Sequence, residues 1–99
     1  MERTTVEERK SDMDLQDIRK ELDVIDRELV KLFEKRMDLS VEVAEYKAET
    51  GKPVLDKDRE RQKIEAVRAL AGDENKQSVE ELFTQLMTLS RRLQYRVLA

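Results

Sequence analysis

A long apolar seam marks the first half of the chain. Large apolar side chains recur at spacings of three and four residues, with Arg36 in one seam position: Leu15, Ile18, Leu22, Ile25, Leu29, Leu32, Leu39, Val43 and Tyr46. This is the heptad spacing of a helix that packs one face against another helix. Asp14 is a suitable N-cap, and Gly51 followed by Pro53 is a suitable end. The pattern therefore predicts a single helix over residues 15–50, about 36 residues long.

Two shorter helices are expected to follow, separated by Gly72. Asp56 is the expected N-cap of the first, whose inward face carries Glu60, Ile64, Val67 and Ala71. The second is expected to start at Ser78, which forms a capping box with Glu81. One apolar row of this helix contains Phe83 and Met87 and then continues with the polar residues Ser90 and Gln94. The sequence thus predicts an all-α fold with three helices per chain, one of them very long.

The long helix exceeds the size of a compact monomer. At about 1.5 Å per residue it spans about 54 Å, whereas a compact domain of about 100 residues is only about 35 Å across. Two shorter helices cannot cover its whole seam, so a second copy of the chain is the simplest partner, packed by two-fold symmetry. We therefore expect a helical homodimer built from a domain over residues 14–99, with a flexible N-terminal leader over residues 1–13.

Composition excludes several kinds of chemistry. The 99 residues include no cysteine and no histidine, which removes disulfides, thiolate nucleophiles, the commonest metal ligands and the commonest general base. A net charge of −3 argues against a nucleic-acid-binding module. No apolar run is long enough to span a membrane, and no signal peptide begins the chain. We expect a cytoplasmic protein that uses no metal and no cofactor.

Polar side chains occupy positions where the core should be. Arg36 lies in the seam, and Lys47, eleven residues later, points within about 20° of the same direction. Ser90 and Gln94 lie one turn apart at the end of an apolar row. Singly, each has an ordinary interpretation: a register-setting or snorkelling arginine, a lysine that complements the helix dipole, and two rim residues. Together they converge on one interior surface, where cations need either internal carboxylates or an anionic ligand.

Arg19 adds a geometric constraint. It precedes Arg36 by seventeen residues. That separation is about 25 Å along a helix axis, so the two side chains of one helix cannot touch the same small ligand. If both arginines bind it, one of them comes from the partner subunit.

An ordered set of short stretches resembles a known family. These stretches are residues 18–23, 34–36, 43–47, 52–54 and 56–61, together with Ser90 and Gln94. With this spacing and punctuation, residues 14–98 resemble the all-helical chorismate mutases, the bacterial type also found fused to prephenate dehydratase. The resemblance implies an entwined dimer of three-helix chains with two equivalent active sites. It also implies the Claisen rearrangement of chorismate to prephenate, on the route to phenylalanine and tyrosine.

The resemblance also implies how the substrate is held. Arg36 and Arg19 of the partner subunit would bind the substrate carboxylates, with Arg59 and Ser90 nearby. Bidentate arginine–carboxylate pairs suit this task, because they fix a flexible dianion in one compact conformer. The apolar walls implied by the resemblance are Val43 and Met87.

The remaining implied roles concern the reaction itself. Lys47 and Gln94 would donate hydrogen bonds to the ether oxygen, and Glu60, helped by Asp56, would receive the ring hydroxyl. A pericyclic rearrangement needs no nucleophile, metal or proton transfer, so a site without histidine and cysteine is adequate. Even a millionfold acceleration requires only about 8 kcal/mol, which orientation and preorganised donors can supply.

Two other functions fit the same pattern. An isochorismate pyruvate-lyase would keep the fold and change the reaction, although Glu60 and Asp56, placed for a chorismate-type ring hydroxyl, favour the mutase. A non-catalytic helical dimerisation module would keep the oligomer and lack a reaction altogether.

Overall fold

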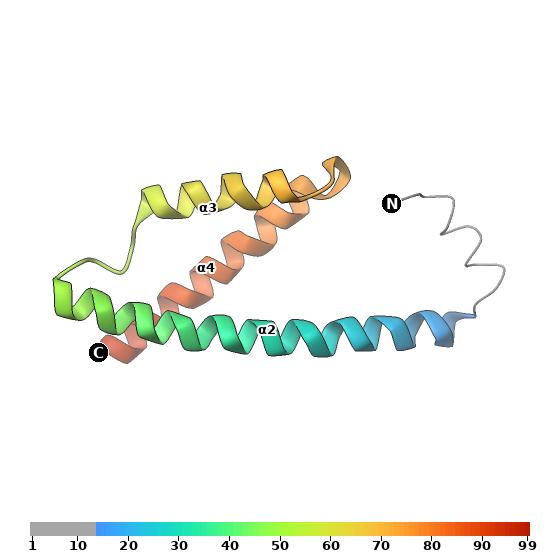
Figure 1. The fold of residues 1–99 in the computed structure, drawn as a ribbon, viewed down its shortest axis with the longest axis horizontal. Helices are drawn as coiled ribbons and strands as arrows, with labels where there is room; N and C mark the ends of the chain where they lie inside the picture. The colour runs from blue at the N-terminus through green and yellow to red at the C-terminus, as the bar shows by residue number, and fades with distance from the viewer. Residues whose placement is uncertain (1–13) are drawn as a thin grey trace. The chain divides into compact units, whose positions relative to one another are not determined.

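The computed structural model describes residues 14–99, and it is helical, as predicted. Its elements are α2 (Leu15–Thr50), α3 (Lys57–Leu70), the 3₁₀ turn η1 (Asp73–Asn75) and α4 (Lys76–Leu98) (Figure 1). The described residues contain no strand, which confirms the all-α fold and its three α-helices. The expected leader, residues 1–13, lies outside the described residues. No helix within residues 14–99 is long and apolar enough to span a membrane.

Both ends of α2 are set by the residues that the sequence predicts. At its start, the backbone N–H of Asp17 donates to Asp14 Oδ1 over 3.0 Å, which confirms Asp14 as the N-cap. At its end, Gly51 adopts a positive φ of 74°. The N–H of Lys52 then donates to the carbonyl oxygen of Lys47 over 2.9 Å, which is the bond of a Schellman motif. The helix therefore ends where a residue without Cβ permits the left-handed turn.

The chain divides into two compact units between Lys35 and Arg36. In the first unit, the described residues 14–35 carry the apolar seam on a single helix. Along this stretch, Leu22, Ile25, Leu29 and Leu32 leave between 51% and 61% of their surface exposed. The seam is thus present in the first unit, and no other described residue of that unit covers it.

The second unit contains the pair formed by α3 and α4, which pack against each other. Asp56 is the N-cap of α3, as expected, and its Oδ1 accepts the backbone N–H of Arg59 over 3.0 Å. Of the expected inward face of α3, Val67 is buried, whereas Ile64 and Ala71 are half-buried. The apolar core of the described chain is small: Ala44, Val54, Val67 and Met87.

The predicted start of α4 is wrong. The helix begins at Lys76, and Ser78 lies inside it, so the expected capping box with Glu81 does not form. The reason is tertiary: Lys76 Nζ donates to the carbonyl oxygens of Arg68 and Ala71, over 2.6 and 3.0 Å, and so satisfies the last turn of α3. With Lys76 held by these two bonds, α4 starts two residues before the position that the local signal indicates.

Candidate active site

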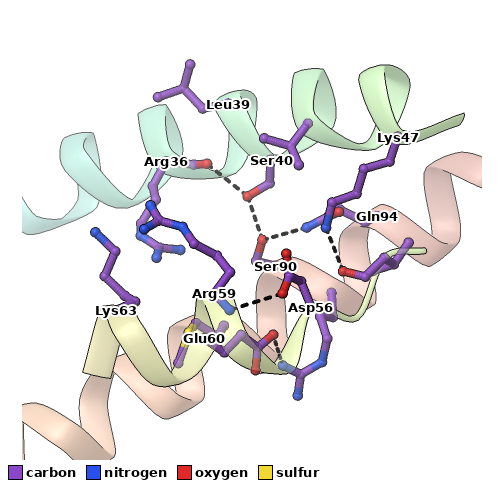
Figure 2. A pocket seen from close by; sticks show the side chains of 14 residues that line it. Arg36, Leu39, Ser40, Lys47, Asp56, Arg59, Glu60, Lys63, Ser90 and Gln94 are labelled. Carbon is purple, nitrogen blue, oxygen red and sulfur yellow. Dashed lines mark hydrogen bonds and ion pairs between the residues drawn. The ribbon is translucent and has the colours of Figure 1, made fainter. Parts of the chain in front are cut away.

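The second unit forms an open cavity of about 290 Å³ between the C-terminal part of α2, the connecting loop, α3 and α4 (Figure 2). This volume lies near the lower end of the range for small-molecule sites, about 300 Å³. The side chains that line it are Arg36, Leu39, Ser40, Val43, Lys47, Val54, Asp56, Arg59, Glu60, Lys63, Met87, Ser90, Arg91 and Gln94.

The cavity brings together all the predicted polar site residues except Arg19. Those that line it are Arg36, Lys47, Asp56, Arg59, Glu60, Ser90 and Gln94, and the predicted walls Val43 and Met87 line it as well. Arg19 belongs to the first unit and does not line this cavity. Its role in a site completed by a second subunit therefore stays a prediction.

Helix α2 contributes two cations from one face. The guanidinium of Arg36 lies over the ring of Phe83, 5.9 Å from its centroid, in the range of a cation–π contact. The ammonium of Lys47 donates to the carbonyl oxygen of Val54 over 2.7 Å. Both side chains are half-buried, and each is held by a neutral group, so its positive charge is not neutralised.

Helix α3 places three further site residues at its first turn. Asp56 caps the helix, which orients the backbone of Arg59 next to its carboxylate. Glu60 lies one residue on, and its Oε2 accepts a hydrogen bond from the guanidinium of Arg91 on α4. The side chains of this ion pair are only about a quarter exposed, at 26% for Glu60 and 27% for Arg91.

Helices α2 and α4 together form a buried polar cluster. Ser40, Ser90 and Gln94 are 6%, 9% and 6% exposed. Gln94 Nε2 donates to Ser90 Oγ over 3.1 Å, and Ser90 Oγ lies 2.7 Å from Ser40 Oγ. The second amide atom, Gln94 Oε1, is buried and has no hydrogen-bond partner among the described residues. Buried polar atoms normally have a hydrogen-bond partner, so this oxygen is open to a water or a ligand in the cavity.

Positive charge exceeds negative charge in the cavity. The cations of the lining are Arg36, Lys47, Arg59, Lys63 and Arg91, and its carboxylates are Asp56 and Glu60. Glu60 is paired with Arg91, and none of the other four cations forms an ion pair with a carboxylate of residues 14–99. Of these four, Arg36, Lys47 and Lys63 are half-buried, and partial burial raises the cost of leaving a cation unpaired, so the cavity attracts a small anion.

Sequence reasoning missed three polar residues of the lining: Ser40, Lys63 and Arg91. Ser40 follows Arg36 by four residues and precedes Lys47 by seven, so the periodicity that connects those cations also points to it. Lys63 follows Glu60 by three residues and shares its face in the same way. Arg91 has no such signal, because its place in the site depends on a contact with Glu60, 31 positions away.

An all-α domain with a cationic cavity between its helices is the class that these observations define. The comparison with known sequences gives the family: residues 18–95 match the family described as chorismate mutase type II, and the chain belongs to it. This confirms the family that the resemblance indicated.

Two curated relatives agree with this assignment. The chain is 38% identical over 61 residues to the chorismate mutase of Methanocaldococcus jannaschii, a match that covers 62% of the chain and 62% of that protein. It is 41% identical over 54 residues to the T-protein of Haemophilus influenzae, over 54% of the chain and 14% of that protein. The matched region thus spans less than two thirds of either relative. No solved structure matches the chain with statistical significance.

Proposed function

We propose that the chain is a chorismate mutase that converts chorismate to prephenate by a Claisen rearrangement. The observation that carries this proposal is the meeting of Lys47 and Gln94, from α2 and α4, in one cavity with the unpaired arginines Arg36 and Arg59. This combination provides fixed hydrogen-bond donors and anion-binding groups, and the rearrangement needs nothing else. The family and the name of the archaeal relative support the same reaction.

Substrate binding is assigned to the arginines. Arg36 and Arg59 line the cavity without a carboxylate partner among the described residues, so their guanidinium groups are available to the carboxylates of the substrate. Paired N–H donors fix the direction of a carboxylate as well as its position, which favours the compact conformer in which the reacting carbons meet. Arg19 of the partner subunit completes this set.

Transition-state stabilisation is assigned to Lys47 and Gln94. Negative charge develops on the ether oxygen as its C–O bond breaks, and an ammonium and an amide N–H can both donate to it. The bond from Lys47 Nζ to the Val54 carbonyl holds the ammonium at the cavity wall before any ligand arrives. Donors fixed in advance need little reorganisation during the reaction, which is why such groups accelerate it.

The ring hydroxyl of the substrate is assigned to Glu60, with Asp56 beside it. Arg91 occupies one carboxylate oxygen of Glu60 and leaves the other to accept a hydrogen bond from a ligand. A carboxylate with a free oxygen suits chorismate, which carries a hydroxyl on its ring.

A homodimer completes the proposal. The exposed side chains of Leu22, Ile25, Leu29 and Leu32 form a row along α2, and contiguous exposed apolar side chains mark sites of protein–protein contact. The buried core of the described chain is correspondingly small, and small domains gain stability from partners. In this dimer each subunit supplies Arg19 to the site of the other. The proposed enzyme acts in the cytoplasm, on the route to phenylalanine and tyrosine.

A substrate comparison tests the proposed reaction. The purified chain is incubated with chorismate and, separately, with isochorismate, and the products are identified by NMR. Prephenate from chorismate is the expected result. Pyruvate from isochorismate, without prephenate from chorismate, would identify a lyase instead, and a folded dimer inert towards both substrates would identify a dimerisation module.

A further inference from the structure

A directed chain of hydrogen bonds connects Gln94 to the backbone of α2. Gln94 Nε2 lies 3.1 Å from Ser90 Oγ, Ser90 Oγ lies 2.7 Å from Ser40 Oγ, and Ser40 Oγ lies 3.1 Å from the carbonyl oxygen of Arg36 (Figure 2). The three side chains are the buried polar side chains of the described residues. Of the three hydrogen-bonded side chains, Ser40 is the one that the proposed reaction does not require.

The direction of these hydrogen bonds follows from the number of hydroxyl protons. A carbonyl oxygen only accepts, so Ser40 must give its single hydroxyl proton to the Arg36 carbonyl. The short contact between the two hydroxyls then requires Ser90 to donate to Ser40. Because the Ser90 proton is used, Ser90 Oγ can only accept from position 94. The amide of Gln94 must therefore present its nitrogen to Ser90.

No other described group fixes this amide. Gln94 Oε1 is buried without a hydrogen-bond partner, so nothing on that side favours one orientation over its flipped alternative. In the flipped orientation Oε1 would face Ser90 Oγ. While Ser90 donates its proton to Ser40, these two oxygens would be acceptors in contact with no proton between them. The preference for the observed orientation thus originates at Ser40.

We propose that Ser40 is a positioning residue that sets the amide of Gln94 with its nitrogen towards Ser90. One hydrogen of Nε2 is used by Ser90 in this arrangement, and the other is free for the ether oxygen of the substrate. This inference rests on the proposed function for its catalytic consequence, whereas the orientation itself rests on the hydrogen bonds alone. It also means that Ser90 donates its only hydroxyl proton to Ser40 and has none left for the substrate while Ser40 is present.

The first test is the Ser40→Ala variant, in which the Ser90 proton is released and the amide can flip. We expect kcat to fall about tenfold with little change in KM, because the lost donor acts on the transition state. Thr50→Ala is the matched control, since Thr50 Oγ1 also donates to the carbonyl four residues earlier, over 3.0 Å, but does not line the cavity. Equal losses in the two variants would overturn the proposal.

A double-mutant cycle separates positioning from a general effect on the fold. In the Gln94→Ala background there is no amide to orient, so Ser40→Ala should cause no further loss of kcat/KM. A residue that only supports the packing of α2 on α4 would cause the same loss in both backgrounds. That additive result would contradict the proposal, even if both single variants lose activity.

A pH profile adds a readout that packing does not move. In Gln94→Glu, Ser90 offers only lone pairs to the new carboxyl while Ser40 is present, which disfavours the charged form. Adding Ser40→Ala frees the Ser90 proton to donate to that carboxylate, so the pKa of the carboxyl falls. The midpoint at which activity is lost with rising pH should then move down by about one pH unit. An unmoved midpoint would overturn the assignment. The charged groups that line the same cavity are unchanged between the two variants: Arg36, Lys47, Asp56, Arg59, Glu60, Lys63 and Arg91.

NMR of the free protein separates this inference from the proposed function. The two side-chain amide protons of Gln94 should differ in hydrogen exchange, one held by Ser90 and one free, and Ser40→Ala should abolish the difference while Thr50→Ala preserves it. A wild-type chain without mutase activity that still shows this response would refute the proposed function and leave the orientation intact. Gln94 amide signals that are the same in wild type and Ser40→Ala would overturn the inference, whatever the activity.

Discussion

The ammonium of Lys47 lies 2.7 Å from the carbonyl oxygen of Val54 and donates a hydrogen bond to it. The backbone carbonyl of the same lysine accepts the N–H of Lys52 in the turn that ends α2. One residue thus closes the helix with its main chain and holds the following loop with its side chain. Val54 is itself buried, so this contact places the cation at a fixed point of the cavity wall.

Replacing Lys47 by alanine should abolish most of the activity but lower the free energy of unfolding only slightly. Loss of one preorganised donor lowers kcat by about 100- to 1000-fold. The lost bond to Val54 should lower the free energy of unfolding by about 1 kcal/mol. Steady-state kinetics and urea unfolding check the two expectations. Lys52→Ala is the control, because that cation lies over the ring of Tyr46, 5.8 Å away, and does not line the cavity. A comparable loss of activity in the control would contradict a specific role for Lys47.

Replacing Gln94 by glutamate should make activity depend on acid. The wild-type amide is neutral and donates at any pH, whereas a carboxyl donates only when protonated. The new carboxylate would also repel the charge that develops on the ether oxygen, so turnover should rise as the pH falls through the pKa of the carboxyl. A pH profile of kcat/KM measures this. Gln85→Glu, an exposed substitution on the same helix, should keep the wild-type profile. A variant at position 94 with an unchanged profile would show that its side chain does not face the ether oxygen.

The ion pair between Glu60 and Arg91 should make a measurable contribution to the free energy of unfolding. Because its side chains are about three-quarters buried, the pair is screened less than one on the surface. A double-mutant cycle with Glu60→Gln and Arg91→Met should give a coupling energy of about 1 kcal/mol in urea unfolding. The pair of Asp58 and Arg61, with side chains 79% and 64% exposed, is the comparison and should couple by less than about 0.5 kcal/mol. Equal coupling in the two pairs would refute this expectation.

Mixing two inactive variants should restore activity if Arg19 crosses the dimer interface. Arg19→Ala and Arg36→Ala homodimers each lack one arginine in both sites. In a heterodimer, one site carries both substitutions and the other carries neither. Unfolding and refolding an equal mixture should therefore recover about one quarter of the wild-type activity, since half of the dimers have one intact site. A mixture as inactive as its components would refute the proposal that Arg19 reaches the site of the other subunit.

The parts of the structure that local chemistry determines were predictable. Helix α2 has the predicted bounds because Asp14 and Gly51 act on their own neighbours, and Asp56 caps α3 for the same reason. The first turn of α4 was not predictable in this way. Its start depends on Lys76 reaching carbonyls of α3, five and eight residues earlier, and this tertiary bond outweighs the local capping signal of Ser78.

The same distinction applies to the site. Arg36 and Lys47 could be found because they interrupt an apolar period, and Ser90 and Gln94 because they continue one. Arg91 could not, because its position near Glu60 depends on how α3 packs against α4. The pairing of Ser40 with Ser90 likewise connects positions fifty residues apart, which no periodicity reports.

The hairpin of α3 and α4 has a consequence for the order of folding. Its closing contacts join residues that are close in sequence: Lys76 bonds to the end of α3, and Arg68 pairs with Glu80 only twelve residues away, over 2.7 Å. Closing so short a loop costs little chain entropy, so this hairpin should form early. The bond between Ser40 and Ser90 closes a far longer loop and should form late. Native-state hydrogen exchange should then find the cavity opening along α2 before the hairpin melts, so that catalytic competence is lost first when the protein is stressed.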